Sequence, residues 1–82
     1  MLDLRVLDCG HNQIEKIPSE LEKLDTLRCE NNLLKSIPST LNKLRILCCG
    51  HNLISEIPPE LKNMAHLDCE DNIIREIPSM LE

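Results

Sequence analysis

Leucine, cysteine, isoleucine and proline return along this chain at one fixed spacing. Leu7 is followed at steps of 20 residues by Leu27, Leu47 and Leu67, and the cysteines, asparagines and prolines keep the same step. The chain therefore divides without insertion into four units, residues 1–20, 21–40, 41–60 and 61–80, with two residues left over. A period of this length is typical of a solenoid, in which each repeat stacks on the next. We predict one repeat domain over residues 1–82.

Each unit predicts one short strand with a single buried face. Apolar and polar residues alternate around Leu7, Asp8 and Cys9, which is the side-chain period of a strand. Stacked units place these strands side by side in a parallel sheet. We expect the strands near residues 6–9, 26–29, 46–49 and 66–69.

The second half of each unit predicts a return segment that covers the inner face of the sheet. A parallel sheet needs such a cover, and Ile14 and Ile17 supply apolar side chains for it. Pro18 follows at once, with a fixed φ and no backbone N–H to donate. We therefore expect a polyproline or 3-10 return rather than an α-helix.

The repeated unit L-x-x-L-x-x-L-x-C-x-x-N-x-I-x-x-I-P resembles a leucine-rich repeat, whose core pattern is matched by Leu4, Leu7, Cys9, Asn12 and Ile14. The short unit is similar to the 20-residue class of bacterial effector proteins and to leucine-rich repeat proteins of large DNA viruses. It departs from the effector pattern because cysteine replaces an aliphatic residue and each unit carries the proline motif only once. The resemblance implies an α/β-type solenoid, mostly parallel β: a four-unit arc without large caps that binds protein on its concave sheet.

Composition and charge narrow the choice of function. The net charge of −5 argues against a nucleic-acid partner, because phosphates require a basic surface. No apolar run approaches the ~18 residues of a membrane-spanning helix. The chain has no Phe, Tyr or Trp, the residues on which most ligand pockets rely. No nucleophile–base pair or phosphate-binding loop stands out, so we expect a non-catalytic protein-binding scaffold without a cofactor.

The five cysteines and the absence of a signal peptide predict free thiols in a reducing compartment. We expect an intracellular, cytoplasmic protein, in the host cell if it is an effector or viral protein.

The stretch LCCGHN suggests a metal site, but the repeat offers a different explanation. Cys49 belongs to a column with Cys9, Cys29 and Cys69, for which we predict the role of small buried hydrophobes. A line of thiols cannot surround a tetrahedral zinc ion, so we expect no metal site. Cys48 points to the opposite face and is predicted to be an exposed thiol. We expect His51, like its counterpart His11, to be a solvated turn residue.

The repeat also predicts a role for two further groups of residues, the asparagines and the outward-facing strand residues. The asparagine column is predicted to satisfy backbone groups where the chain turns out of the strand, and consists of Asn12, Asn32, Asn52 and Asn72. The candidate partner-binding residues are the outward strand positions: Val6, Asp8, Thr26, Arg28, Glu30, Ile46, Cys48, His66, Asp68 and Glu70.

The ends of the array predict self-association, with a closed dimer favoured. A solenoid without polar caps exposes the core of its terminal units. Here Met1 already stands in the leucine column, and the sequence stops one residue after Leu81. The candidate residues are Met1, Leu2, Leu4, Leu7, Met64, Leu67, Met80 and Leu81. Two alternatives remain open at this point: a structural fragment or engineered minimal array with no partner, and a thiol- or metal-binding scaffold.

Overall fold

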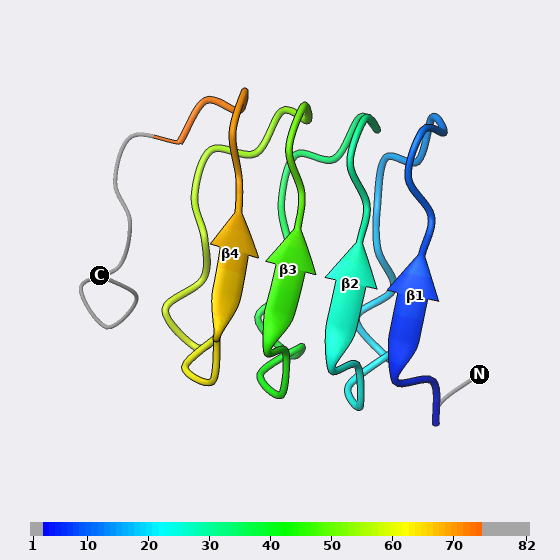
Figure 1. The fold of residues 1–82 in the computed structure, drawn as a ribbon, viewed down its shortest axis with the longest axis vertical. Helices are drawn as coiled ribbons and strands as arrows, with labels where there is room; N and C mark the ends of the chain where they lie inside the picture. The colour runs from blue at the N-terminus through cyan, green and yellow to red at the C-terminus, as the bar shows by residue number, and fades with distance from the viewer. Residues whose placement is uncertain (1–2, 75–82) are drawn as a thin grey trace.

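Four short parallel strands form one sheet in a computed structural model that describes residues 3–74. The strands are β1 (Val6–Asp8), β2 (Thr26–Arg28), β3 (Ile46–Cys48) and β4 (His66–Asp68), and they lie in chain order (Figure 1). This confirms the predicted solenoid. The residues proposed for self-association at positions 1, 2, 80 and 81 lie outside the described range.

The strands end one residue earlier than the sequence predicts, yet the backbone pairing continues past them. The Cys9 N–H donates to the Arg28 carbonyl at 2.8 Å, and the Cys29 N–H donates to the Cys48 carbonyl at 2.8 Å. Within the sheet, Leu7 pairs with Leu27, and the inner leucines of β3 and β4 continue the same row. Equal repeat lengths therefore give a sheet in which like positions are neighbours.

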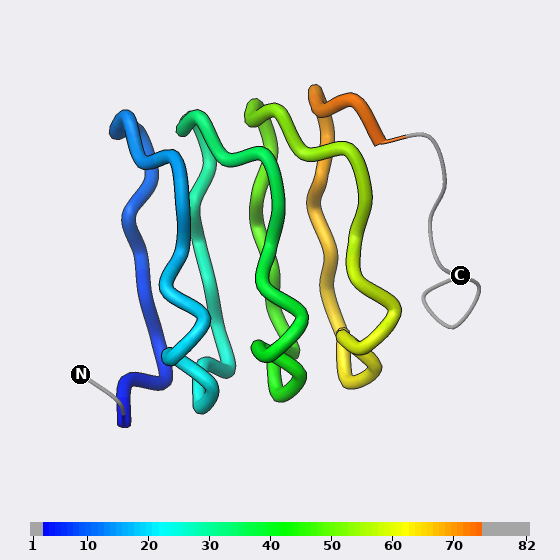
Figure 2. Tube along the Cα trace, turned by 180° about the vertical axis from the view of Figure 1, so that it is seen from behind, coloured from blue at the N-terminus to red at the C-terminus, as the bar shows by residue number. Residues whose placement is uncertain are grey.

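The core lies between the sheet and the return segments, which run behind the strands (Figure 2). Side chains of the two middle units fill it: Leu24, Leu27, Leu44 and Leu47 are completely buried. The return segments contribute buried isoleucines and leucines at the positions that the sequence predicts, namely Ile17, Leu34, Ile37, Ile54 and Ile57. The matching residues of the outer units, such as Leu7 and Leu67, are only half-buried because each has a neighbouring unit on one side only.

Isolated turns, rather than a continuous 3-10 helix, close each described return segment. The Leu21 N–H bonds to the Pro18 carbonyl at 3.3 Å, and the Leu24 N–H bonds to the Leu21 carbonyl at 3.3 Å. These are i to i−3 bonds, the type found in a 3-10 helix, and the second and third units repeat the first of them. Within residues 3–74 the chain forms no helix, and hence none long and apolar enough to cross a membrane.

The chain leaves each strand through a residue with left-handed backbone geometry. The four residues are His11, Asn31, His51 and Asp71, with φ between 53° and 59°. Histidine, asparagine and aspartate are the non-glycine residues that tolerate this region best. The two histidines were predicted to lie in turns, but the shared left-handed geometry was not predicted, although the residue types at these four positions were a usable signal.

Candidate functional site: the open face of the sheet

The face of the sheet that points away from the return segments, hereafter the open face, carries the predicted partner-binding residues. Strand side chains alternate between faces, so the residues on either side of each core leucine project together from this face. The return segments cover only the opposite side, as the two views of the backbone show (Figures 1 and 2).

Exposure across the open face differs between its edges and its centre. Val6 at the β1 edge is 59% exposed, and His66 on β4 is also exposed. Thr26 is only 8% exposed, and its hydroxyl donates to the Asp25 carboxylate at 3.1 Å. Small side chains on central strands are covered by longer neighbours on both sides. Thr26 therefore offers little surface to a partner.

The prediction of an exposed thiol at Cys48 is wrong, because this side chain is only 6% exposed. It pairs with Arg28 on one side and Asp68 on the other. The Arg28 guanidinium Nη1 lies 4.0 Å from the Cys48 Sγ, within reach of a weak hydrogen bond. Burial raises the pKa of the Cys48 thiol, and the positive charge of Arg28 partly offsets this. Cys48 lies on the face that strand alternation predicts, but the side chains of the two neighbouring strands cover it.

The charges that remain accessible on the open face are predominantly acidic. Asp8 and Glu70 are exposed and Glu30 and Asp68 are half-exposed, whereas Arg28 is the one arginine or lysine among the predicted open-face positions of residues 3–74. A face lined mainly by carboxylates attracts basic groups and repels acidic ones.

Two glycines, just past the ends of β1 and β3, lie next to glutamate side chains of the following units. A Cβ built on Gly50 would lie 3.2 Å from the Glu70 Cγ, which is tighter than normal contact. On Gly10 it would lie 3.4 Å from the Glu30 Oε1. Each glutamate therefore lies beside the glycine of the preceding unit.

The asparagine column joins neighbouring units at the turns. The Asn32 side-chain amide donates to the carbonyls of Cys9, Cys29 and Glu30 at 3.0–3.2 Å. Its Oδ1 accepts the Ile14 N–H of the preceding unit at 3.0 Å. Asn52 and Asn72 repeat this pattern one and two units further along.

Asn12 makes only bonds within its own unit, to the carbonyls of Cys9 and Gly10 at 2.9 and 3.0 Å. Among the described residues, no buried side-chain nitrogen or oxygen lacks a hydrogen-bond partner.

One group of potential metal ligands lies beside the open face, where the chain turns after β3 and after β4. The His51 Nδ1 lies 2.9 Å from the Asp71 carboxylate, and its Nε2 lies 3.6 Å from the Glu70 carboxylate. Within residues 3–74, this is the one set of three such residues whose donor atoms lie within 4.8 Å of one another. All three side chains are exposed, and exposed ion pairs contribute little. The group does not include Cys48.

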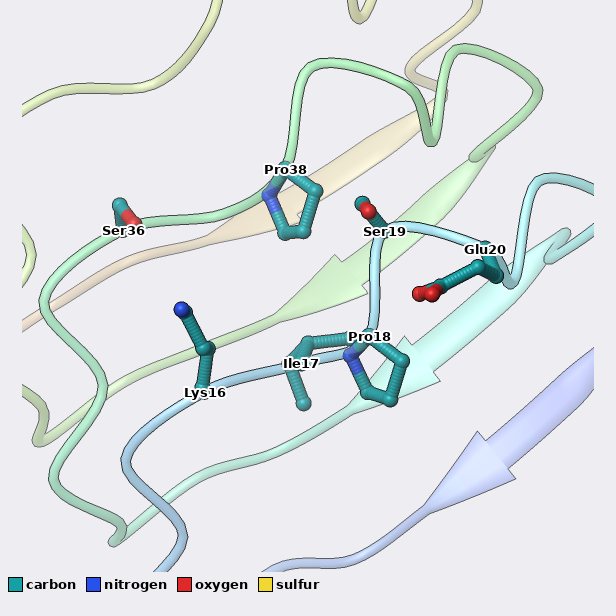
Figure 3. Close-up of a pocket in the computed structure, with 7 residues that line it drawn as sticks. All are labelled: Lys16, Ile17, Pro18, Ser19, Glu20, Ser36 and Pro38. Carbon is teal, nitrogen blue, oxygen red and sulfur yellow. The ribbon is translucent and has the colours of Figure 1, made fainter.

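A shallow cavity of about 430 Å³ lies on the opposite side of the molecule, between the return segments of the first two units (Figure 3). It is lined by Lys16, Ile17, Pro18, Ser19, Glu20, Ser36 and Pro38. This cavity was not predicted from the sequence, because it forms only where two return segments stack. Apart from one lysine and one glutamate, its lining carries no ionisable group.

Stacked units with one strand each, a continuous parallel sheet and asparagine-bonded turns define a solenoid repeat protein. A model of leucine-rich repeats in two copies matches residues 3–43, which is half of the chain, and a single leucine-rich repeat model matches residues 43–64. The chain belongs to the leucine-rich repeat family. Such repeats generally mediate protein–protein interaction.

Solved structures show the same architecture. A leucine-rich repeat protein of Leptospira interrogans is similar at 24% identity, with a TM-score of 0.81 over 92% of this chain and 21% of that protein. A chain of the BIR3–SERK2 complex from Arabidopsis thaliana is similar at 30% identity, with a TM-score of 0.77 over 94% of this chain and 48% of that one. The chain thus spans less than half the length of either neighbour. No curated protein matches it.

Proposed function

We propose that this chain is a non-catalytic module that binds a protein partner on the open face of its sheet. The observation that carries the proposal is the uncovered sheet face with its accessible carboxylates, opposite a face that the return segments cover. Leucine-rich repeats generally bind proteins, and the matched Arabidopsis chain comes from a complex of two proteins.

The charge of the open face favours a basic segment as the partner. Four of its carboxylates, on Asp8, Glu30, Asp68 and Glu70, are at least partly accessible, and the Arg28 guanidinium also contacts the Cys48 thiol. Four strands about 4.8 Å apart offer a narrow surface, so the interface is small. Small interfaces are typical of weak or transient complexes. We therefore expect binding that weakens as salt screens the charges.

A library of immobilised peptides that spans a range of net charge tests this proposal. We expect the chain to select basic peptides and to lose them in the double variant Asp68→Asn and Glu70→Gln. The matched control is Glu15→Gln with Glu56→Gln, which removes the same charge from exposed positions outside the open face. Equal losses in both variants would show that net charge, and not this face, determines binding.

We also infer that the free chain self-associates, most simply as a dimer that covers a terminal unit. Leu4, Leu7 and Ile14 of the first unit are half-buried, whereas Leu24, Leu27 and Leu34 at the same positions of the second unit are completely buried. The backbone of an edge strand can pair with a further strand. A contact between like ends would close the assembly.

Sedimentation across a wide range of concentration tests self-association. We expect Val6→Lys, at the β1 edge, to shift the chain toward the monomer. Leu33→Lys, at an exposed apolar position that is 43% exposed in the second unit, serves as the control. A monomer at every concentration would refute the inference.

We propose a reducing, intracellular location from the five free cysteines. Detection of the tagged protein in a secreted or periplasmic fraction would contradict this proposal.

A further inference from the structure

The cysteine column, defined as Cys9, Cys29, Cys49 and Cys69, lies in an unbroken line through all four units. Each of the first three members donates its backbone N–H at 2.8 Å to the unit that follows, so the strand pairing extends through the column. Paired strands lie about 4.8 Å apart. Neighbouring cysteines that share one rotamer therefore place their sulfur atoms at this same separation.

The column is buried in the middle and more open at its ends. Cys29 and Cys49 are completely buried, whereas Cys9 and Cys69 are half-buried, and all four are free thiols. Burial, and after it the negative charge of the neighbouring Cys69 thiolate and Asp68 carboxylate, raise the pKa of the Cys49 thiol to about 12. The charge of one thiol affects the pKa of the next because the cysteines of successive units lie close together.

The spacing of the column matches one particular mode of metal binding. A metal–thiolate bond is about 2.3 Å long, so two bonds in a straight line separate the sulfurs by about 4.6 Å. Stacked side chains also approach such an ion from opposite sides. We propose that adjacent cysteines of the column bind a soft monovalent ion, Cu(I), in linear two-coordinate geometry. The proposal is independent of the protein-binding function.

The chemistry distinguishes this site from the zinc site that the line of thiols excludes. Zinc requires four ligands around one point, whereas thiolates select soft ions such as Cu(I). Binding converts two thiols and one Cu(I) ion into a bis-thiolate complex of net charge −1 and releases two protons. The ion arrives already reduced, so no electron is transferred. The raised pKa of the thiols opposes this proton release, and binding should therefore strengthen as pH rises.

Access to the column is available at its ends. Cys9 and Cys69 are half-buried, so an ion can reach one of these sulfurs before the neighbouring buried thiol completes the site. Cys48 cannot share an ion with Cys49 in this way, because consecutive strand residues point to opposite faces.

Two triple variants test the proposal, since each keeps two column cysteines and lacks Cys48. The adjacent-pair variant carries Cys48→Ala, Cys49→Ala and Cys69→Ala, and so keeps Cys9 and Cys29, the half-buried end of the column and its neighbour. The separated-pair variant carries Cys29→Ala, Cys48→Ala and Cys69→Ala, and so keeps Cys9 and Cys49, two strand spacings apart. Circular dichroism before titration establishes that both are folded.

The readout is competition, without oxygen, against a coloured Cu(I) chelator, with native mass spectrometry to count ions per chain. We expect the adjacent-pair variant to withdraw one Cu(I) ion per single chain and the separated-pair variant to withdraw none. Equal withdrawal by both variants, or none by either, would overturn the proposal.

A second measurement does not depend on the folding of these variants. X-ray absorption of Cu(I) bound to the Cys48→Ala chain, which keeps the whole column, should show two sulfur neighbours. Three or more sulfur neighbours, or failure to bind Cu(I), would also overturn it.

Discussion

The side chain of Asn52 donates a hydrogen bond to the carbonyl of Cys29, which belongs to the preceding unit, at 3.0 Å. The same amide donates to the Cys49 and Gly50 carbonyls of its own unit, and its Oδ1 accepts the Leu34 N–H at 3.0 Å. One buried side chain thus satisfies backbone groups of two successive units. Adjacent units are therefore held together by the asparagine column as well as by the sheet.

We expect Asn52→Ala to lower the free energy of unfolding by about 1–3 kcal/mol, the cost of leaving buried polar groups without partners. Asn12→Ala is the matched control, because Asn12 is exposed and bonds only within its own unit. Leu53→Ala, at a position that is 45% exposed, should cost less than Asn52→Ala. Denaturant melts measure all three, and equal small losses would contradict the structural role of the column.

The left-handed backbone at His51 leads to a second prediction. A β-branched residue is strained at φ 57°, so His51→Val should destabilise the chain by about 1–2 kcal/mol. His51→Asn should be nearly neutral, because asparagine tolerates this geometry and the ion pairs of His51 are exposed. If both variants lost the same stability, the ion pairs and not the backbone would be responsible.

Thiol accessibility provides a third prediction. Iodoacetamide should label Cys9 and Cys69, which are half-buried, before it labels Cys29 and Cys49, which are completely buried. Cys48 should react more slowly than an exposed thiol, since Arg28 and its other neighbours cover it. Mass spectrometry of peptides from chains labelled for increasing times gives the order. Rapid labelling of Cys48 under native conditions would show that its cover opens readily.

The same burial predicts that alkaline conditions destabilise the fold. Folding raises the pKa of Cys49 to about 12, whereas a thiol of the unfolded chain titrates near 8.5. Stability from this neutral thiol is fully present below about pH 8.5 and is lost as the pH rises toward 12, at up to about 1.4 kcal/mol per pH unit. Melts of the native chain and of Cys49→Ala over this range should therefore converge. Parallel pH profiles would contradict the prediction.

The sequence by itself was sufficient to predict the solenoid, because equal repeats leave few ways to bury the same columns. Leu7 and its counterparts recur every 20 residues, and a parallel stack without stagger places all four in one row, completely buried at Leu27 and Leu47 of the middle units. The structural role of the asparagine column could also be predicted from the sequence. A polar residue that recurs beside each buried strand is expected to form hydrogen bonds with the backbone groups of the turn.

Only the tertiary structure decided how much of each outward residue remains accessible. Strand alternation gives the face on which a side chain lies, but neighbouring strands determine what covers it. Cys48 and Thr26 therefore point outward and are nevertheless buried, since each is short and flanked by other side chains on both sides. Alternation is a property of one chain segment, whereas burial depends on residues 20 positions away that stacking brings alongside.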